Sequence, residues 1–152
     1  MSTPHQLSDK VAVGGQPTVG ELHDLRAQGF VAVVDLRTSG EEGLPLSPEA
    51  ESFAALEVGL SYSHLPVAIA ELDQEHVRRL RATIEAAPGP VYVHCAAGQR
   101  ACSLSLMAID PHSGEHLIAR AEQAGLPVTD ERLKAFVRLG SAHSNWDLLQ
   151  AV

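Results

Sequence analysis

The chain has 152 residues, which is about the length of one domain, and we expect residues 1–152 to fold as a single domain. Apolar residues make up 45% of the sequence, enough to form a core, so an intrinsically disordered chain is excluded. The net charge of −8, the scarcity of aromatic residues and the lack of a long apolar run argue against nucleic-acid binding and against membrane insertion.

Strands and helices alternate through about residue 110 of the predicted structure, and the remainder is predicted to be helical. Thr18 and Glu21 are predicted to form a capping box, Ser47 precedes a proline at a first helical position, and Asp73 is a predicted N-cap. The predicted strands are 10–13, 30–36, 60–67 and 91–94. The predicted helices are 18–28, 48–58, 74–86, 100–109, 113–124, 130–139 and one from 144 onward.

The alternation of strands with crossover helices predicts a three-layer α/β fold with a mostly parallel central sheet. The β-branched run over 30–36 supports this prediction, because strands of parallel sheets are buried on both faces. Helices flank the sheet, and the C-terminal segment is helical. Ligands of such folds bind beyond the carboxyl ends of the strands, and the segment after residue 94 lies at such an end.

The segment 91–101 contains the candidate catalytic and anion-binding residues. A strand leads to Cys95, three small residues follow at 96–98, and a helix begins at about Arg100. Small residues let the backbone curl, so that the amides at the start of the helix turn inward and bind a tetrahedral anion. The same amides stabilise a thiolate at Cys95, and the Arg100 guanidinium can bind two oxygens of the anion. An activated thiolate beside an anion site is suited to attack on phosphorus or sulfur.

The pattern His-Cys-x-x-Gly-x-Arg after a strand resembles the phosphate loop (P-loop) of the cysteine-dependent protein tyrosine and dual-specificity phosphatases. Four stretches in this order resemble one bacterial branch more closely, the beta-lactamase-hydrolase-like phosphatase family. These stretches are Val13 to Pro17, Val33 to Arg37 with Glu41 and Glu42, Tyr62 to Val67, and His94 to Arg100.

The resemblance implies a hydrolase that forms a phosphocysteine intermediate on a phosphate monoester, without a metal or an organic cofactor. Cys95 is then the nucleophile, His94 supports the loop, and a general acid comes from Asp73 or Glu71. The substrate is a phosphoprotein or a small phosphate ester. The implied phosphate-binding residues are Ala96, Ala97, Gly98, Gln99, Arg100 and Ala101.

Two alternatives remain open from the residues. Four residues separate Cys95 from Arg100, a spacing shared with rhodanese-like sulfurtransferases, in which Cys95 would carry a persulfide. Ala101 occupies the position where the phosphatases usually have Ser or Thr, which keeps open a catalytically weak anion-binding pseudophosphatase.

Other residues have simpler interpretations. Cys102 is expected to pack in the core rather than to act as a resolving thiol. The pattern His112-x-x-Glu115-His116 is not expected to bind zinc, because His112 precedes the helix that begins after Ser113. Two cysteines and a polar N-terminus without features of a signal peptide indicate a reducing, cytoplasmic setting.

The strand end at Asp35 and Arg37 has two interpretations. The two side chains either pair with each other, or Arg37 adds positive charge to the anion pocket. Glu41 and Glu42 are expected to lie in a solvated loop.

Overall fold

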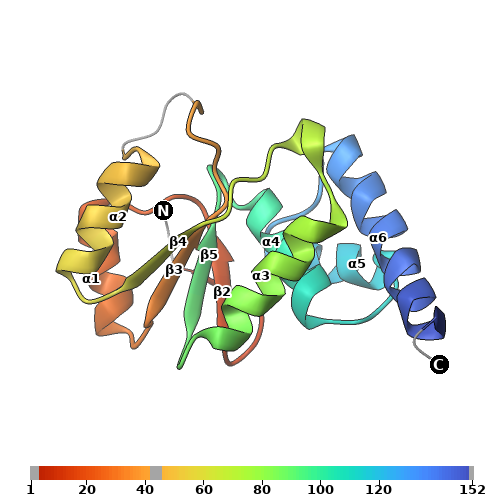
Figure 1. Ribbon diagram of the computed structural model, residues 1–152, viewed down its shortest axis with the longest axis horizontal. Coiled ribbons are helices and arrows are strands. Elements are labelled where there is room, and N and C mark those ends of the chain that lie inside the picture. Colours follow the sequence, from red (N-terminus) through yellow and green to blue (C-terminus); the bar gives the residue numbers. More distant parts are fainter. Residues whose placement is uncertain (1–3, 42–45, 151–152) are drawn as a thin grey trace.

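A five-stranded sheet forms the centre of the computed structural model, which describes residues 4–41 and 46–150, with side chains up to residue 140 (Figure 1). The strand order is β1-β2-β5-β3-β4. The three pairs formed by β2, β5, β3 and β4 are parallel, and only β1 is antiparallel to its neighbour β2. The strands are β1 (His5–Gln6), β2 (Val11–Gly14), β3 (Ala32–Asp35), β4 (Ser61–His64) and β5 (Val91–His94).

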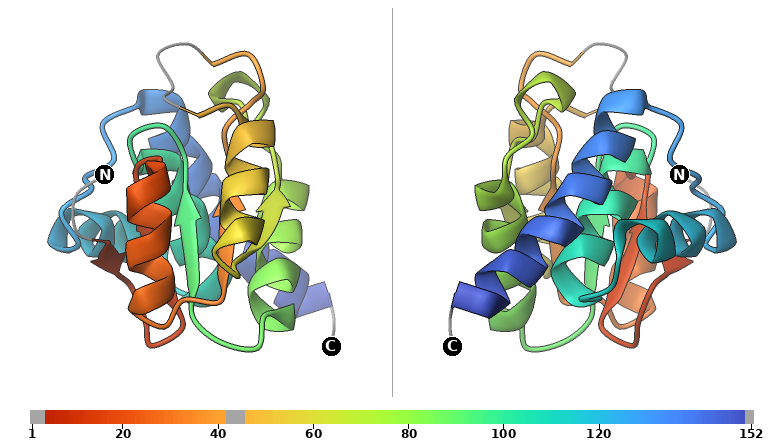
Figure 2. Two further views of the ribbon diagram at one scale, coloured as in Figure 1. Left: turned by 90° about the vertical axis from the view of Figure 1, so that its left-hand side faces the viewer. Right: turned by 90° about the vertical axis from the view of Figure 1, so that its right-hand side faces the viewer.

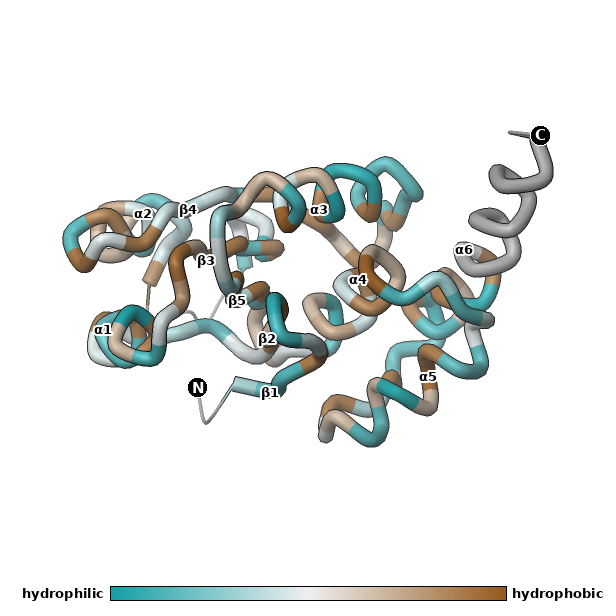
Figure 3. The backbone as a smooth tube through the Cα atoms, turned by 90° about the horizontal axis from the view of Figure 1, so that it is seen from below, coloured by the Kyte–Doolittle hydropathy of each residue, from teal (hydrophilic) through white to brown (hydrophobic). Residues whose placement is uncertain are grey.

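Helices cover both faces of this sheet, so the predicted three-layer α/β fold with a mostly parallel sheet is confirmed. Two helices, α1 (Val19–Ala27) and α2 (Pro48–Glu57), lie on one face (Figure 2). The other face carries α3 (Gln74–Ala86) and α4 (Gln99–Ile109), and the tube seen from below shows the strands between the two layers (Figure 3). The remaining helices are α5 (Gly114–Gln123), α6 (Glu131–Gln150) and the short 3-10 helix η1 (Ile69–Glu71).

Each face of the sheet has its own apolar core. The smaller core packs Leu22 and Leu25 of α1 and Ala55 of α2 against the sheet. The larger one joins the opposite face to α3, α4, α5 and α6, and it includes Leu80 and Leu104. In the described part of the chain, no helix is both long enough and apolar enough to cross a lipid bilayer.

The carboxyl ends of the four parallel strands point to one edge of the sheet, and four connections emerge there. These are the segments after β2 and after β3, the segment that includes η1 after β4, and residues 95–98 after β5. The last three lie at the top of Figure 1. Parallel strands place the ends of β3, β4 and β5 side by side, with Asp35 level with both His64 and His94. A site assembled from distant parts of the sequence therefore forms at this edge.

Two features differ from the sequence prediction. Strand β1 was not predicted, because two residues are too few to show the alternating pattern of a strand. The predicted break at Gly140 is wrong, because α6 continues through this residue. A Cβ atom at Gly140 would lie 2.2 Å from Met107 Cε and 2.5 Å from Gln74 Nε2, so the glycine lets α6 pack closely rather than ending it.

We predict opposite effects for alanine at two helical glycines. A Cβ atom at the buried Gly114 would lie 2.6 Å from the Cα atom of Arg138, so Gly114→Ala must push α5 away from α6 and cost about 1–3 kcal/mol. Gly20 in α1 is exposed, with its closest neighbour 3.9 Å away, so Gly20→Ala should stabilise the protein by up to about 1 kcal/mol. Urea unfolding of the two variants measures both effects, and a neutral Gly114→Ala would contradict the close packing of α5 on α6.

Candidate active site

The loop between β5 and α4 places the thiol of Cys95 against the start of a helix. Gly98 has a φ of +109°, a left-handed conformation that disfavours other residues, and a Cβ atom there would lie 3.0 Å from Leu126 Cδ2 and 3.2 Å from the carbonyl carbon of Gly14. In this conformation the Gly98 amide donates a hydrogen bond to Cys95 Sγ over 3.1 Å. The thiol therefore lies directly beside the N-terminus of α4.

The segment that follows β2 is hydrogen-bonded to the Cys95 loop and to β5. The amide of Gln16 donates to the carbonyl of Ala96 over 3.2 Å, and the Tyr92 hydroxyl donates to the carbonyl of Gly15 over 2.6 Å. Within the described residues, no protein group accepts a hydrogen bond from the amides of Ala96 or Ala97. These donors, together with those of the first turn of α4, are therefore available to an anion.

A pocket of about 180 Å³ opens above this loop. Cys95 is only 2% exposed, and it lies at the bottom of the pocket as one of its lining residues. The lining also includes residues of η1, of the loop before α6 and of α6 itself. The lining residues are Ile69, Cys95, Ala96, Ala97, Gln99, Arg100, Asp130 and Leu133.

Arg100 is fixed by a carboxylate from the segment after β3. Its Nη1 and Nη2 donate to the two oxygens of Glu41 over 2.8 and 2.6 Å, and Nη1 also donates to the carbonyl of Val67 over 2.8 Å. The hydrogen bond to Glu41 raises the pKa of Arg100. Burial opposes ionisation of Glu41, but the hydrogen bonds from Arg100 and Thr38 outweigh it and lower the pKa of that carboxyl. The expectation that Glu41 lies in a solvated loop is wrong, whereas Glu42 lies outside the described residues.

A fully buried polar cluster underlies the Cys95 loop. The Arg37 guanidinium donates to both oxygens of Asp35 over 2.9 and 2.8 Å and to Glu51 Oε1 over 3.0 Å, so it pairs inside the fold instead of lining the pocket. His94 Nε2 donates to Glu51 Oε2 over 2.5 Å, and His94 Nδ1 lies 3.2 Å from the carbonyl oxygen of Cys95. The side chains of Asp35, Arg37, Glu51 and His94 are all 0% exposed.

The hydrogen bonds in the polar cluster also compensate for the cost of burying its charges. Burial raises the pKa of Asp35, but hydrogen bonds from Arg37 and Tyr62 outweigh burial and leave this pKa below its usual value. The Tyr62 hydroxyl donates to Asp35 Oδ2 over 2.7 Å, and burial together with this bond raises the pKa of Tyr62. His94 therefore sits between an ion cluster and the backbone of Cys95, a position that suits the supporting role expected for it.

The two acids expected from the sequence lie away from the pocket lining. Asp73 is exposed, and its Oδ1 accepts a hydrogen bond from the amide of Glu75, which makes it the N-cap of α3. Glu71 is exposed at the end of η1. Neither side chain is among the residues that line the pocket.

Asp130 is a carboxylate of the pocket lining that sequence reasoning did not select. The Gln99 side chain accepts hydrogen bonds from the amides of Thr129 and Asp130 over 2.9 and 3.0 Å, and so attaches this segment to the first turn of α4. Asp130 Oδ1 accepts from the amide of Leu133 over 3.0 Å. From the sequence, Asp130 is only a residue at the start of a helix. No sequence pattern shows that it lines the same pocket as Cys95.

The remaining two residues of interest in α4 belong to the core. Ala101 is fully buried among apolar side chains, and it offers no hydroxyl to the Cys95 sulfur. Cys102 is also fully buried, and burial raises the pKa of its thiol to about 12, so it is a packing residue rather than a reactive thiol. Both cysteines are free thiols.

Solved structures share this fold over nearly the whole chain. A protein of Neisseria meningitidis superposes with a TM-score of 0.77 at 20% identity, covering 89% of this chain and 96% of that one. TpbA of P. aeruginosa gives a TM-score of 0.76 at 15% identity, covering 96% and 90%. Tk-PTP gives a TM-score of 0.76 at 20% identity, covering 95% of this chain and 97% of that one, so the predicted tyrosine-phosphatase-like α/β fold is confirmed.

The sequence comparisons then define the family. The chain belongs to the family described as "Beta-lactamase hydrolase-like protein, phosphatase-like domain", whose model matches residues 5–112, and the resemblance identified from the sequence is confirmed. A "Beta-lactamase hydrolase-like protein" of Agrobacterium fabrum is 30% identical over 122 residues. That match covers 80% of this chain but only 27% of the relative, so the chain spans about a quarter of its length.

We predict that the buried polar cluster under the loop is a major source of stability. Glu51→Ala removes a partner of both Arg37 and His94 and leaves a buried charge with fewer contacts, which should cost about 3–5 kcal/mol. Glu49 lies on the same helix but is exposed, so Glu49→Ala should change the free energy of unfolding by less than about 0.5 kcal/mol. Chemical denaturation of both variants measures the change in the free energy of unfolding. A loss below about 1 kcal/mol for Glu51→Ala would show that the polar cluster is not a major source of stability.

Proposed function

We propose that this protein is a cysteine-dependent phosphatase that hydrolyses a phosphate monoester through a phosphocysteine intermediate. The observation that supports it best is the position of Cys95, a lining residue of a pocket of about 180 Å³, whose Sγ accepts a hydrogen bond from the Gly98 amide over 3.1 Å. Membership of a phosphatase-like family agrees with this chemistry. The small pocket favours a phosphoryl group on a narrow or flexible carrier, such as a phosphorylated side chain or a small ester.

The pocket offers the donors that a phosphate dianion needs. A guanidinium has five N–H donors. Glu41 and Val67 engage both Nη1 hydrogens of Arg100 and one Nη2 hydrogen, which leaves Nε–H and the second Nη2 hydrogen for an anion. Arg100 can therefore bind two phosphate oxygens side by side without leaving Glu41. The amides of Ala96 and Ala97 and those of the first turn of α4 complete the proposed anion site, while the Gly98 amide donates to Cys95 Sγ.

The reaction follows from these positions in two displacements. In the first, the Cys95 thiolate attacks phosphorus, an S–P bond forms, and the P–O bond to the leaving group breaks as that oxygen takes a proton from an acid. In the second, water attacks phosphorus, gives its proton to the same carboxylate, and displaces the thiolate to release inorganic phosphate. No metal ion or organic cofactor takes part in either step, and the free thiol is suited to a reducing compartment such as the cytoplasm.

The acid is best supplied by Asp130. Its Oδ1 is used by the amide of Leu133, so Oδ2 is the oxygen available to exchange a proton with a ligand in the pocket. Asp73 and Glu71 remain the candidates implied by the family resemblance. They could act only if the segment after β4 moved them toward the pocket, and Asp73 would then stop capping α3.

We predict that hydrolysis of an aryl phosphate such as p-nitrophenyl phosphate depends on Cys95 and Arg100. Cys95→Ser should abolish turnover, and Arg100→Lys should lower kcat/KM by about 100-fold or more, because an ammonium cannot bind two oxygens while also satisfying Glu41. Cys102→Ala is the matched control and should remain active, since this thiol is buried in the core. Acid quenching during turnover followed by mass spectrometry should find one phosphoryl group on Cys95.

The same proteins distinguish the alternatives. Conversion of thiosulfate and cyanide to thiocyanate, with one extra sulfur on Cys95 and no phosphatase activity, would replace the proposal with a sulfurtransferase. Binding of phosphate that Arg100→Ala abolishes, without turnover of either substrate, would leave an anion-binding module.

We predict that Asp130 matters most for poor leaving groups. Asp130→Asn keeps the N-cap of α6, since Asn caps helices as well as Asp, but it removes the proton donor. Turnover of an alkyl phosphate should fall by about 10²–10⁴-fold, while an aryl phosphate with a good leaving group should be affected less. Steady-state kinetics on both substrates is the measurement. If Asp73→Asn or Glu71→Gln shows this pattern instead, the acid comes from the segment after β4 and the role of Asp130 is refuted.

A further inference from the structure

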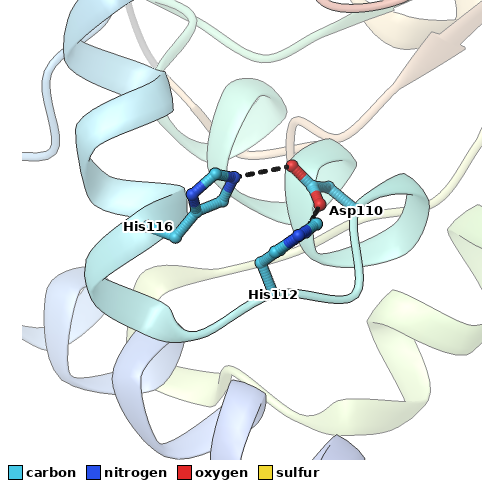
Figure 4. Close-up of side chains that lie close together, drawn as sticks. All are labelled: Asp110, His112 and His116. Atoms are coloured by element: carbon cyan, nitrogen blue, oxygen red, sulfur yellow. Dashed lines mark hydrogen bonds and ion pairs between the residues drawn. The ribbon is translucent and has the colours of Figure 1, made fainter.

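A cluster of two histidines and one aspartate lies at the corner between α4 and α5. Asp110 follows the last residue of α4, His112 lies in the connection, and His116 is in the first turn of α5. Figure 4 shows both imidazole rings turned toward the Asp110 carboxylate from different sides. The Cys95 loop is at the opposite end of α4, and the 11 residues of this helix separate the two places by about 16 Å.

The atoms of this cluster are spaced like the ligands of a small metal ion. His116 Nε2 lies 3.3 Å from Asp110 Oδ2, and His112 Nδ1 is hydrogen-bonded to Asp110 Oδ1. One nitrogen or oxygen atom from each residue lies within 4.8 Å of the others, and the two imidazole centroids are 4.3 Å apart. Zinc bonds of about 2.0–2.2 Å in tetrahedral directions separate neighbouring ligand atoms by about 3.3–3.6 Å, which small side-chain rotations would produce here.

The carboxylate is held in place by a partner outside the cluster. Arg120 Nη1 donates to Asp110 Oδ2 over 2.8 Å, and its Nη2 donates to the carbonyl of Leu7 over 2.6 Å. Burial opposes ionisation of Asp110, but hydrogen bonds from Arg120 and His112 outweigh it and lower the pKa of this carboxyl. Metal-binding carboxylates are commonly oriented by such hydrogen bonds, which leave a second lone pair for the ion.

The two imidazoles leave one side of the cluster accessible. The side chains of His112 and His116 are 59% and 45% exposed, whereas that of Asp110 is 9% exposed. An ion can therefore enter from solvent and keep a water molecule as its fourth ligand. Two imidazole nitrogens and one carboxylate oxygen suit Zn²⁺, and they suit Mg²⁺ or Ca²⁺ poorly, because those ions prefer oxygen ligands.

We propose that Asp110, His112 and His116 form a zinc-binding site with one open coordination position, distinct from the pocket at Cys95. This proposal replaces the expectation that His112 and His116 bind no zinc, which was based on the position of His112 before the start of α5. In the structure Glu115 accepts a hydrogen bond from Arg138 over 2.5 Å, and Asp110, two residues before His112, supplies the carboxylate instead. Bound zinc would connect the end of α4 to the start of α5 and stabilise the folded state.

The test is calorimetric titration of the whole chain with Zn²⁺, together with absorption spectra of the Co²⁺-loaded protein. We expect one ion per chain and a higher Tm with zinc than without it. His112→Ala and His116→Ala should each weaken zinc binding at least tenfold. Two matched controls should bind like the parent protein, namely Glu115→Gln, which changes the other acid of the pattern, and His23→Ala, which removes an exposed histidine of α1.

The spectra separate this site from the cysteines. Bound Co²⁺ should show the visible bands of tetrahedral nitrogen and oxygen coordination without a thiolate charge-transfer band, and Cys95→Ser should bind zinc unchanged. A thiolate band, equal weakening in His23→Ala, or no zinc binding by a folded parent protein would each overturn the proposal. Circular dichroism of the metal-free variants confirms that the two histidine substitutions leave the fold intact. The outcome does not depend on phosphatase activity, because zinc binding is measured without substrate.

Discussion

The buried ion cluster of Asp35, Arg37, Glu51 and His94 is the interaction on which the rest of the site depends. Charged groups are costly to remove from water, and this cost is offset only when each finds a partner at close range. Here the partners come from the end of β3, from α2 and from the end of β5, so that satisfying the charges also fixes these three elements relative to one another. The Cys95 loop begins directly after His94, so the ion cluster also fixes where this loop starts.

A second layer of contacts joins the loop to the segments around it. Glu41 determines the orientation of the Arg100 guanidinium, and Gln99 attaches the segment before α6 to the first turn of α4. These hydrogen bonds are made by the side chains of Arg100 and Gln99, and they leave the backbone amides of Ala96 and Ala97 unused. These contacts hold the Arg100 guanidinium and the segment before α6 against the Cys95 loop without a ligand, and such preorganisation would favour binding and catalysis at the proposed anion site.

The sequence predicted what depends on local patterns and missed what depends on distant partners. Thr18 and Glu21 are three positions apart, and their capping box forms as expected, because its hydrogen bonds close within one turn of helix. Glu41 and Arg100 are 59 positions apart, and no spacing rule relates them. The loop at Cys95 was recognised since its strand, small residues, arginine and helix are contiguous. The position of Asp130 in the pocket lining could not be predicted, because it depends on how α6 packs against the rest of the fold.

The burial of Cys102 also bears on how the protein would tolerate oxidants. A thiolate at Cys95 is the form that peroxide converts to a sulfenic acid, and many redox-regulated enzymes rescue this species with a second cysteine of their own. The sequence contains only one other cysteine, and its thiol, with a pKa of about 12, is almost entirely protonated at neutral pH and shielded within α4. An oxidised Cys95 would therefore find no reactive partner thiol within this chain, because the Cys102 side chain is held inside the core.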